Sequence, residues 1–425
     1  MLNFLRKLIP DRHPLRLFYH KAMAFLAAVV YRFPARKMVV VGVTGTNGKT
    51  TTVNMITSIL NEAGYKTGMA STINFQVGSD EWVNASKQTT LGPFYLQKLL
   101  LRMKKEGCTH AVLEVTSHAI DQSRIFGIDF DVAVITSVTS DHVEYHGSFE
   151  GYLNAKGKLF KNVSKAIVLN VDDEHYKYFS QFHADEEITY GLGNALVYAS
   201  NLNQKASGSD FTLHIPGGSI DVKIKLPGRF NVYNSMAAAA ACFVLGVPLK
   251  KIAKGLEAKE GIAGRFERVD CGQKFDVIVD YAHGPDSLES LLSLYKDLTA
   301  GRLFAIFGAT GGGRDKGKRP LMGEAAHKHA DYIIVTDDDP YEEDEWGIIE
   351  QVSKGIPRKE GDEFWKIPDR KEAIRLALTM AVEGDTVVIA GKGAEEVLML
   401  KGKRVPWNDR KVVEELLKGE IKSHL

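Results

Sequence analysis

The amino-acid sequence predicts an α/β protein with two successive sheets: a central domain whose parallel sheet carries small antiparallel hairpins, and a C-terminal Rossmann-like domain. Short apolar segments with the character of strands alternate with helical segments along most of the 425 residues. Residues 195–225 differ, because "FTLHIPGGSIDVKIKL" alternates and contains Pro-Gly-Gly, as antiparallel hairpins do. After "KEGIAGRFERVD", near residues 259–270, the strand and helix alternation starts again, which predicts a second sheet.

We expect three parts: an N-terminal helical segment (1–37), a central domain (38–260) and a C-terminal domain (261–425). The first part contains "RLFYHKAMAFLAAVVYRF", in which only residues 22–30 are continuously apolar, too few to span a bilayer. Two interpretations stay open for this segment. It is either a helix packed on the body of the protein or a membrane-surface helix through residues 15–33, with basic flanks.

Residues 38–63 predict a phosphate-binding loop. Residues 38–43 form an uncharged, mostly β-branched run, typical of a buried parallel strand. Gly45 and Gly48 then allow close approach of the backbone to a ligand, and Lys49 and Thr50 open a helix over 50–63. This order presents backbone N–H groups and a helix N-terminus to phosphate. The usual pattern has a glycine where this chain has Val43, so spacing alone leaves the class of loop open. Lys49 is expected to face solvent.

The remaining elements follow the same alternation. Further strands are expected at "HAVLEV", "DVAVIT" and "AIVLNV", and in the C-terminal domain at "FDVIVDYAH", "RLFAIFGAT", "ADYIIVTDDD" and "DTVVIAGKG". Helices are expected over residues 94–106, 149–160, 231–245 and 249–256. Because open α/β sheets bind ligands at the carboxyl ends of their strands, polar residues that follow these strands are candidate site residues.

Four strand ends carry such residues. Glu114 ends a buried strand, where a carboxylate without a cation is costly. Carboxylate and imidazole groups near a phosphate loop suit a magnesium site, with the Thr50 hydroxyl as a further ligand. The imidazole of His142 is one candidate, although this residue could equally cap a turn. The other candidates are Asp141, His146 and Lys156 in the central domain, and Asp280, His283, Arg314 and Lys318 in the C-terminal domain.

The amino-acid composition indicates a globular protein and gives no sign of nucleic-acid binding, of disulfides or of a zinc site. Hydrophobic content of 44% and charged content of 25% are typical of a globular protein, and a net charge of +1 offers no reason to expect nucleic acid. Cys108, Cys242 and Cys271 lie far apart without a CxxC motif, so neither a disulfide framework nor a zinc site is indicated. We expect a cytoplasmic monomer, with the inner membrane surface as the alternative location.

Nine motifs, in order, resemble the Mur ligase family, and within it the synthetases that add the third residue of the peptidoglycan stem peptide. They are "GVTGTNGKTT", "TTLGPFYLQ", "EVTSHAIDQSR", "SDHVEYHG", "AKGKLF", "LPGRFNVYN", "DYAHGPDSLE", "GGRDKGKRPLMG" and "AGKGAEE". The loop of this family is GTNGKT, so Val43 is no defect. The resemblance implies an ATP- and Mg²⁺-dependent amide-bond ligase that works through an acyl phosphate on small-molecule substrates: ATP, an amino acid and a muramoyl peptide.

The resemblance also implies roles for particular residues. Lys49, Glu114, His142 and Lys156 would be catalytic, and Thr50, Glu114, His142 and carbamylated Lys156 would hold metal. ATP would contact Gly45, Thr46, Asn47, Gly48, Lys49, Thr50, Thr51, Asn231, Asn234, Arg265, Asp280 and His283. The muramoyl peptide would contact Thr89, Thr90, Thr116, Gln122 and Arg124. The amino acid would contact Arg314, Asp337, Asp338, Asp339, Tyr341, Gly391 and Glu395.

Two departures from the family pattern bear on the substrates. Residues 1–37 are too few for the usual domain that grips uridine diphosphate, so a lipid-linked acceptor or a partner protein stays open. Enzymes selecting meso-diaminopimelate show Asp-Asn-Pro-Arg, whereas this chain has Tyr341 in place of the arginine. The acidic residues around Tyr341 favour L-lysine, or L-ornithine, over meso-diaminopimelate. The alternatives are a folylpolyglutamate or cyanophycin type of ligase, and a non-catalytic nucleotide-binding scaffold of wall synthesis.

Overall fold

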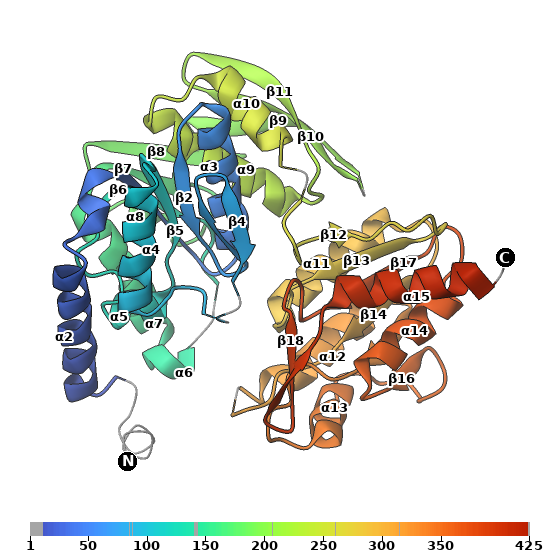
Figure 1. Cartoon of the computed structure of the whole chain (residues 1–425). Helices are drawn as coiled ribbons and strands as arrows, with labels where there is room; N and C mark the ends of the chain where they lie inside the picture. The colour runs from blue at the N-terminus through green and yellow to red at the C-terminus, as the bar shows by residue number, and fades with distance from the viewer. Residues whose placement is uncertain are drawn as a thin grey trace. The chain divides into compact units, whose positions relative to one another are not determined.

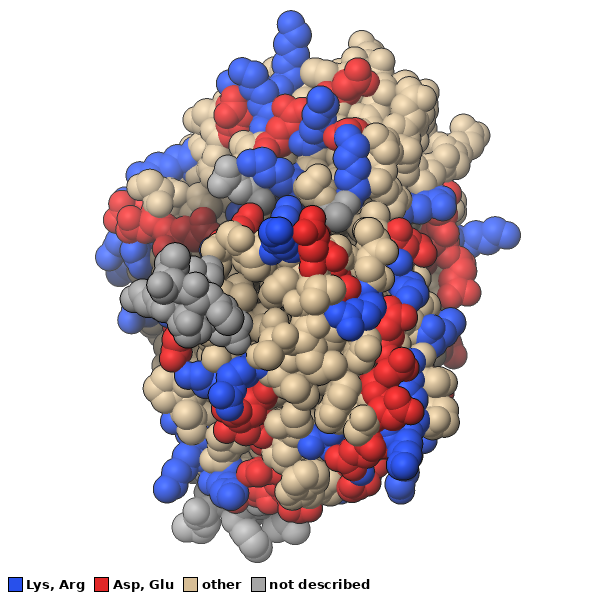
Figure 2. Space-filling view, turned by 90° about the vertical axis from the view of Figure 1, so that its right-hand side faces the viewer, with Lys and Arg blue, Asp and Glu red and all other residues tan. Residues whose placement is uncertain are grey.

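Each of two units of the chain is built on its own sheet (Figure 1). The computed structural model describes residues 12–84, 86, 88–139, 143–205, 207–259, 261–313 and 315–423. The units are Met1–Glu260 and Gly261–Leu425. Both combine parallel strands with covering helices, which confirms the predicted fold class. Basic and acidic side chains are interspersed over the face shown in Figure 2.

The first unit has an eleven-stranded sheet in the order β11-β10-β9-β8-β7-β6-β1-β5-β2-β3-β4. Its middle is parallel from β9 to β2, and both edges are antiparallel. The predicted hairpins are therefore an edge of the main sheet, and the opposite β3–β4 edge was not predicted. The strands are β1 (Val39–Thr44), β2 (Thr67–Ala70), β3 (Asn74–Val77), β4 (Asp80–Val83), β5 (His110–Glu114), β6 (Phe130–Ile135), β7 (Val163–Asn170), β8 (Glu186–Gly191), β9 (Val197–Lys205), β10 (Gly208–Ile215) and β11 (Gly218–Ile224).

The helices of this unit pack on both faces of the sheet. Helices α3, α9 and α10 pack together on one face, and the other face is covered by α4 and α7. The alanine run of α9, residues 237–241, is completely buried, because small side chains let this helix approach α3 and the strands closely. The helices are α2 (Pro14–Val30), η1 (Pro34–Lys37), α3 (Lys49–Glu62), α4 (Pro93–Lys105), α5 (Ser117–Asp121), α6 (Val143–His146), α7 (Phe149–Gly157), η2 (Lys158–Asn162), α8 (Tyr176–Phe179), α9 (Arg229–Val244) and α10 (Leu249–Glu257).

The second unit has a six-stranded sheet in the order β12-β13-β17-β14-β15-β16, in which only β12 is antiparallel. Apolar clusters fill both faces, one under α11, α12 and α13 and the other under α14 and α15. The strands are β12 (Glu267–Arg268), β13 (Asp276–Asp280), β14 (Leu303–Phe307), β15 (Tyr332–Val335), β16 (Phe364–Lys366) and β17 (Thr386–Ala390), with a separate hairpin of β18 (Val397–Leu400) and β19 (Lys403–Pro406). The helices are α11 (Pro285–Leu298), α12 (Lys318–His329), α13 (Glu345–Ser353), α14 (Arg370–Met380) and α15 (Asp409–Ser423).

Candidate active site

The glycine loop between β1 and α3 is held in a shape that side chains would disrupt. Gly45 has φ +148° and Gly48 has φ +84°, conformations that residues with a Cβ rarely adopt. A Cβ at Gly45 would lie 1.9 Å from Thr136 Oγ1, and one at Gly48 would lie 2.3 Å from Asn234 Oδ1. Thr136 Oγ1 also donates to the Asn47 carbonyl at 2.6 Å. Thr136, the residue after β6, thus fixes the conformation of the glycine loop.

Lys49, the first residue of α3, bends back over this loop. Its Nζ donates to the carbonyl oxygens of Gly45 at 3.0 Å and Thr46 at 2.8 Å. The expectation that Lys49 faces solvent is therefore wrong. The side chain is half-buried because the start of the helix places its ammonium over the carbonyl groups of the preceding turn.

Glu114, at the end of β5, is a buried carboxylate beside the loop. It accepts hydrogen bonds from Thr50 Oγ1 at 2.9 Å, from the Thr72 backbone N–H at 2.8 Å and from Thr72 Oγ1 at 2.9 Å. All three donors are neutral, so the charge of a buried anion is left for a cation to balance. A hydroxyl and a carboxylate next to a phosphate loop fit Mg²⁺, which prefers oxygen ligands.

Lys156, on α7, reaches the same loop from the other side. Its side chain is buried, and its Nζ donates to the Gly45 carbonyl at 2.6 Å and lies 4.4 Å from the centre of the Tyr152 ring. The Tyr152 hydroxyl is in turn 2.8 Å from Thr46 Oγ1. Two ammonium groups, those of Lys49 and Lys156, therefore meet at one carbonyl oxygen.

A polar cluster continues from Glu114 along the ends of the neighbouring segments. Thr90 Oγ1 donates to the Glu114 carbonyl at 3.0 Å and lies 3.3 Å from Thr116 Oγ1. Arg124 donates from Nη1 to the Thr90 carbonyl at 2.8 Å and from Nη2 to Gln122 Oε1 at 2.8 Å. Burial lowers the pKa of the Arg124 guanidinium. These residues form one connected surface beside the loop.

On the other flank of the loop, α9 contributes two buried asparagines. Thr52 Oγ1, on α3, donates to Asn234 Oδ1 at 3.4 Å. Asn234 Nδ2 donates to Asn231 Oδ1 at 3.1 Å, and Asn231 Nδ2 donates to the Pro227 carbonyl at 2.7 Å. The two amides therefore tie the start of α9 to the helix that follows the glycine loop.

In the second unit, the end of β13 groups three of the predicted residues. Asp280 accepts two backbone N–H groups of adjoining loops, at 2.7 and 2.8 Å, and burial raises its pKa. The Arg265 guanidinium lies 4.9 Å from the centre of the Tyr281 ring, and His283 Nδ1 is 2.9 Å from the Tyr281 carbonyl. The carboxyl end of β13 is thus a polar, aromatic surface.

The aspartates after β15 are not an open acidic surface. Asp337, Asp338 and Asp339 are 4–6% exposed. Lys392, which follows β17, is buried and donates from Nζ to Asp339 Oδ1 at 2.8 Å and to Glu395. Burial alone would lower the pKa of Lys392, but the three carboxylates at Asp338, Glu395 and Asp339 raise it instead. The unit therefore balances much of this negative charge internally.

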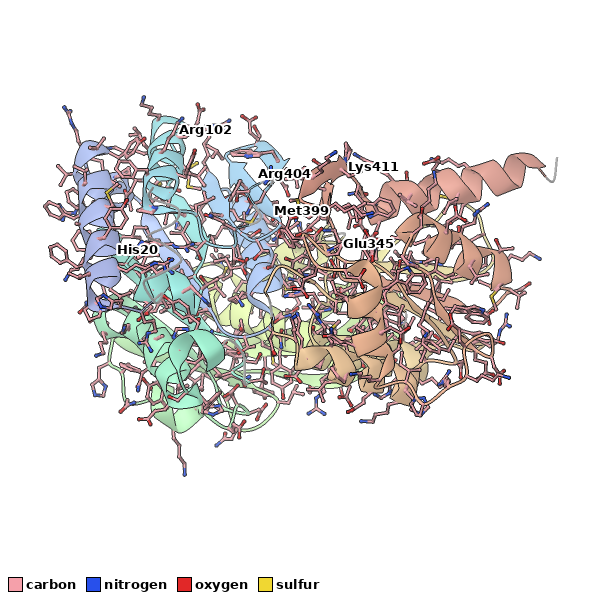
Figure 3. The ribbon with its side chains drawn as sticks, turned by 90° about the horizontal axis from the view of Figure 1, so that it is seen from below. His20, Arg102, Glu345, Met399, Arg404 and Lys411 are labelled. Atoms are coloured by element: carbon pink, nitrogen blue, oxygen red, sulfur yellow. The ribbon has the colours of Figure 1, made fainter. Side chains whose placement is uncertain are left out.

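Tyr341 is held between two loops rather than projecting freely. Its backbone has φ +56°, and its N–H donates to the Met399 carbonyl of β18 at 3.2 Å. Its ring packs so closely on Gly312 that a Cβ there would lie 2.9 Å from Tyr341 Cδ2. Nearby, Glu343 accepts from the Gly313 backbone N–H at 3.0 Å and from the fully buried Arg319 at 3.1 Å. These contacts fix the loop before α12. Met399 and Arg404 mark the hairpin in Figure 3.

Two family models match the chain: the Mur ligase middle domain over residues 43–242, and the Mur ligase glutamate ligase domain over residues 264–393. The "UDP-N-acetylmuramoyl-L-alanyl-D-glutamate--2,6-diaminopimelate ligase" of Geobacillus kaustophilus (strain HTA426) is 42% identical over 407 residues, which cover 94% of this chain and 82% of that protein. The chain belongs to the Mur ligase family. Like its relatives, this Mur ligase is an ATP-dependent enzyme that forms amide bonds.

Two further likenesses agree. The "UDP-N-acetylmuramyl-tripeptide synthetase" of Roseiflexus sp. (strain RS-1) is 39% identical over 408 residues, covering 91% of this Mur ligase and 80% of that protein. A solved structure of a "UDP-N-acetylmuramoyl-L-alanyl-D-glutamate--2, 6-diaminopimelate ligase" matches with a TM-score of 0.64 and 34% identity, covering 90% of this chain and 79% of that one. The resemblance seen in the sequence is confirmed.

Most sequence-predicted site residues of this Mur ligase fall into local groups, each within one unit. In the first unit, Thr46, Asn47, Thr50 and Thr51 lie in or directly after the loop, and Thr89 adjoins Thr90. Gly391 follows β17 and lies close to Asp338, since a Cβ there would lie 2.6 Å from Asp338 Oδ2. His142 and Arg314 lie outside the described residues, as does Asp141. Among the described residues, no three His, Cys, Asp or Glu side chains are grouped to hold a metal ion.

Sequence reasoning missed several residues of these groups. Thr72 supplies two of the three donors to Glu114, and nothing in "STINF" distinguishes it. Lys392 pairs with Asp339, and Arg370 donates to the Asp337 carbonyl. A usable signal existed for Lys392, because a lysine directly after a buried strand in "AGKGAEE" needs a nearby carboxylate.

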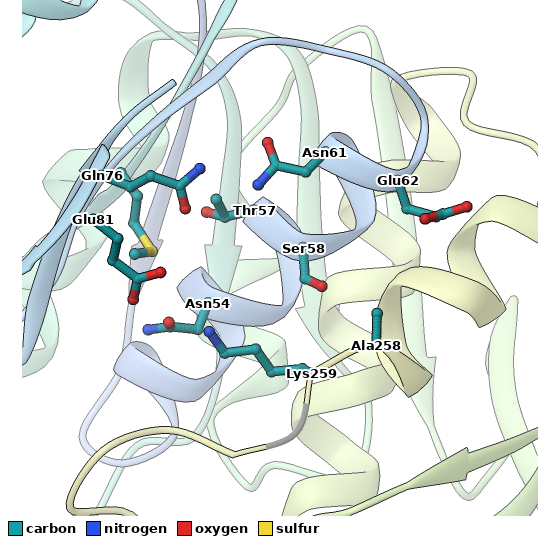
Figure 4. Close-up of a pocket in the computed structure, with 10 residues that line it drawn as sticks. Asn54, Thr57, Ser58, Asn61, Glu62, Gln76, Glu81, Ala258 and Lys259 are labelled. Carbon is teal, nitrogen blue, oxygen red and sulfur yellow. The ribbon is translucent and has the colours of Figure 1, made fainter. Parts of the chain in front are cut away.

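A separate cavity of about 370 Å³ lies beside α3 (Figure 4). Asn54 lines it, and its Nδ2 donates to the Thr50 carbonyl, one turn earlier on α3, at 3.0 Å. None of the sequence-predicted site residues lines it, so the cavity is distinct from the glycine loop. Its lining is mostly polar and comprises Asn54, Thr57, Ser58, Asn61, Glu62, Met69, Gln76, Glu81, Ala258 and Lys259.

Proposed function

We propose that this Mur ligase adds a diamino acid to the terminal carboxylate of a muramoyl-dipeptide precursor of peptidoglycan, with ATP converted to ADP and phosphate. The observation that carries the proposal is the group around the glycine loop. Glu114 joins Thr50 there, and the two lysines Lys49 and Lys156 share the Gly45 carbonyl. The relatives described above are named for this step of peptidoglycan synthesis.

The reaction would run in two steps. A carboxylate oxygen of the muramoyl peptide attacks the γ-phosphorus of ATP, ADP leaves, and an acyl phosphate forms. The amine of the amino acid then attacks the acyl carbon, and phosphate leaves as the amide forms and the nitrogen loses a proton. Negative charge grows on the phosphoryl oxygens in the first step, so preorganised cations at the loop would lower its barrier. Lys49 would exchange its carbonyl partners for those oxygens.

Thr50 and Glu114 would hold one Mg²⁺ ion, and His142 with carbamylated Lys156 a second. Bound there, Mg²⁺ supplies positive charge against the ATP phosphates. Carbamylation has a physical rationale in this chain. Two ammonium groups at the Gly45 carbonyl repel each other, and converting Lys156 into an anion would turn that repulsion into attraction.

Substrate contacts follow the local groups. The muramoyl peptide would bind Thr89, Thr90, Thr116, Gln122 and Arg124, next to Glu114. Asn231, Asn234, Arg265, Asp280 and His283 would contact the nucleotide. The amino acid would bind near Arg314, Asp337, Asp338, Asp339, Tyr341, Gly391 and Glu395.

The acidic residues around Tyr341 favoured L-lysine or L-ornithine as the added amino acid, and the structure changes this preference. Lys392 pairs with Asp339, and burial raises the pKa of Asp337 and of Asp338, so the aspartates favour a distal ammonium less than the sequence alone indicated. With the 42%-identical relative named for 2,6-diaminopimelate, we place meso-diaminopimelate first and L-lysine second. Tyr341 would then leave the distal carboxylate to another cation, such as Arg314.

The test is ADP release from ATP and Mg²⁺ with muramoyl dipeptides, UDP-linked or lipid-linked, paired with meso-diaminopimelate, L-lysine or L-ornithine. Product mass under equal competition identifies the amino acid, and predominant lysine addition would reverse the order above. Lys49→Ala should lose at least about 100-fold in ADP release, whereas Lys177→Ala, an exposed lysine elsewhere, should not change it. Release that needs no muramoyl acceptor, or a near wild-type rate in Lys49→Ala, would overturn the proposal.

A further inference from the structure

Most of the large apolar side chains of helix α2 are exposed, although the Phe25 ring still lies 5.8 Å from that of Phe126, edge to face. Seven of them are 45–72% exposed, and their spacing along the sequence puts all seven on one face of the helix. The buried residues of α2 are the small Ala24, Ala27 and Ala28, on the opposite face. A helix that only completes the core buries its large apolar residues and exposes polar ones. The exposed set is Leu15, Phe18, Tyr19, Phe25, Leu26, Val29 and Val30.

The inner face holds α2 firmly in this orientation. Gly127 packs so closely that a Cβ there would lie 3.0 Å from the Ala28 Cβ and 2.9 Å from the Phe33 ring. At the end of the helix, the Tyr31 ring lies 6.5 Å from that of Phe94 on α4, edge to face. Figure 3, in which His20 marks α2 and Arg102 marks α4, shows the two helices side by side. The apolar face is therefore presented outward by packing on the body.

Basic residues surround this face. Residues 12–37 contain six Lys and Arg and no Asp or Glu, in a chain whose net charge is only +1. At helical spacing, Arg16 and Lys21 lie on opposite flanks of the apolar face. Arg12 is held by the protein body, because its Nε pairs with the buried Asp121 at 3.1 Å. Arg36 pairs with the exposed Asp129 at 3.8 Å, and such a pair is weak in water. The six are Arg12, Arg16, Lys21, Arg32, Arg36 and Lys37.

We infer that α2 docks this Mur ligase on an anionic lipid surface, with its axis in the plane of the membrane. An anionic bilayer supplies both an apolar layer for the exposed face and negative charge for the flanks. A second copy of α2 is the less suitable occupant, because it would bring two basic flanks together without any acid in the segment. Among the described helices, none is long and apolar enough to cross a bilayer. Membrane docking through α2 would give the proposed ligase a location in the cell, and the inference does not depend on the proposed function.

Co-sedimentation of the full chain with vesicles of phosphatidylcholine, alone or mixed with phosphatidylglycerol, tests the inference. The wild type should bind the anionic vesicles, and less tightly as salt is raised. Leu15→Gln/Phe18→Gln should bind at least about tenfold more weakly, with an unchanged melting temperature because both side chains are exposed. The matched control is Leu196→Gln/Trp346→Gln, which changes two similarly exposed apolar residues elsewhere and should bind as the wild type does.

The charge contribution is measured separately. Lys21→Gln/Lys37→Gln should bind anionic vesicles more weakly and with a smaller dependence on salt. Lys177→Gln/Lys354→Gln, which changes two exposed lysines elsewhere, should bind them as the wild type does. Wild-type protein that stays in the supernatant, or that binds phosphatidylcholine equally well, would overturn the inference. So would concentration-dependent self-association that Leu15→Gln/Phe18→Gln abolishes, which would make a second copy the occupant. Because sedimentation needs no catalysis, these outcomes are independent of ligase activity.

Discussion

Arg370→Met should strongly destabilise the second unit, because Arg370 is a completely buried cation at the ends of two strands. Its guanidinium forms a two-point ion pair with Asp409 of α15, with both N–O distances 2.8 Å. It also donates to the Asp337 carbonyl at 3.1 Å and to the Ala390 carbonyl at 2.9 Å. Burial opposes its charge, but Asp409 more than offsets that effect, so the pKa of Arg370 is raised.

The expected loss of unfolding free energy in Arg370→Met follows from the buried groups that lose their partner. Removing one partner of a buried ion pair costs about 3–5 kcal/mol, because the Asp409 carboxylate would stay buried without its cation. Two carbonyls lose donors as well, at about 1 kcal/mol each. The total of about 5–7 kcal/mol compares with a typical domain stability of about 5–15 kcal/mol. Arg370→Met/Asp409→Leu should recover about 2 kcal/mol or more, since no unpaired charge remains.

Urea unfolding followed by tryptophan fluorescence measures this effect. Three of the four tryptophans, Trp346, Trp365 and Trp407, belong to the second unit, so the signal reports mainly on it. Arg375→Met, on the exposed side of the same helix, is the control and should cost less than about 1 kcal/mol. The reasoning fails if Arg370→Met unfolds within about 1 kcal/mol of wild type, or if the double variant is no more stable than the single one.

Three further predictions concern single residues. Burial, with the nearby Glu345 charge, raises the pKa of Asp337 to about 7. The folded state therefore holds this proton more tightly than the unfolded state, and stability should fall as pH rises from about 4 to above 7, by up to about 4 kcal/mol. Asp337→Asn should flatten that slope in urea titrations at each pH, and an unchanged slope would reject the assignment. Gly48→Ala should abolish ADP binding as measured by calorimetry, because the new Cβ would clash with Asn234 and the backbone has a positive φ. Gly48→Ala/Asn234→Ala removes the clash but keeps the positive φ, so it should still bind ADP weakly. Normal ADP affinity of Gly48→Ala would contradict this prediction. Lys156→Ala should lose most ADP release and regain part of it with added short carboxylates, and full activity would exclude Lys156 from the site.

Local chemistry made part of the site predictable. The glycine loop, its lysine and the carboxylate at the end of β5 could be recognised because each depends on residues close in sequence or on one strand. Of the two antiparallel edges, in contrast, only the one over residues 195–225 could be recognised, and only as hairpins. Their pairing with the main sheet depends on hydrogen bonds between distant segments, and β3–β4 is too short to show a clear alternation.

The charge balance of the second unit depended on tertiary structure. The sequence shows Asp337, Asp338 and Asp339 as a run of acids, but Lys392, from the loop after β17, pairs with Asp339, and Arg370 of α14 donates to the Asp337 carbonyl. In the chain Lys392 is about 50 positions away and Arg370 about 30, so the local sequence pattern could not pair them with the aspartates. In the fold, Asp339 is paired with Lys392, and burial raises the pKa of Asp337 and of Asp338, so these acids favour a cationic substrate less than the sequence alone indicated.

The sequence by itself determined that the protein is a two-sheet α/β protein with a phosphate loop, because the glycine loop and the strand and helix periodicity are local properties. The ligase activity was implied by the resemblance of its motifs to the Mur ligase family. The sequence also determined which residues of α2 share a face. Only the tertiary structure decided that this face points outward, because periodicity is the same whether an apolar stripe meets the protein core or its surroundings. Close packing settled the choice: the alanine face allows α2 to approach Gly127, and the phenylalanine face would not fit there.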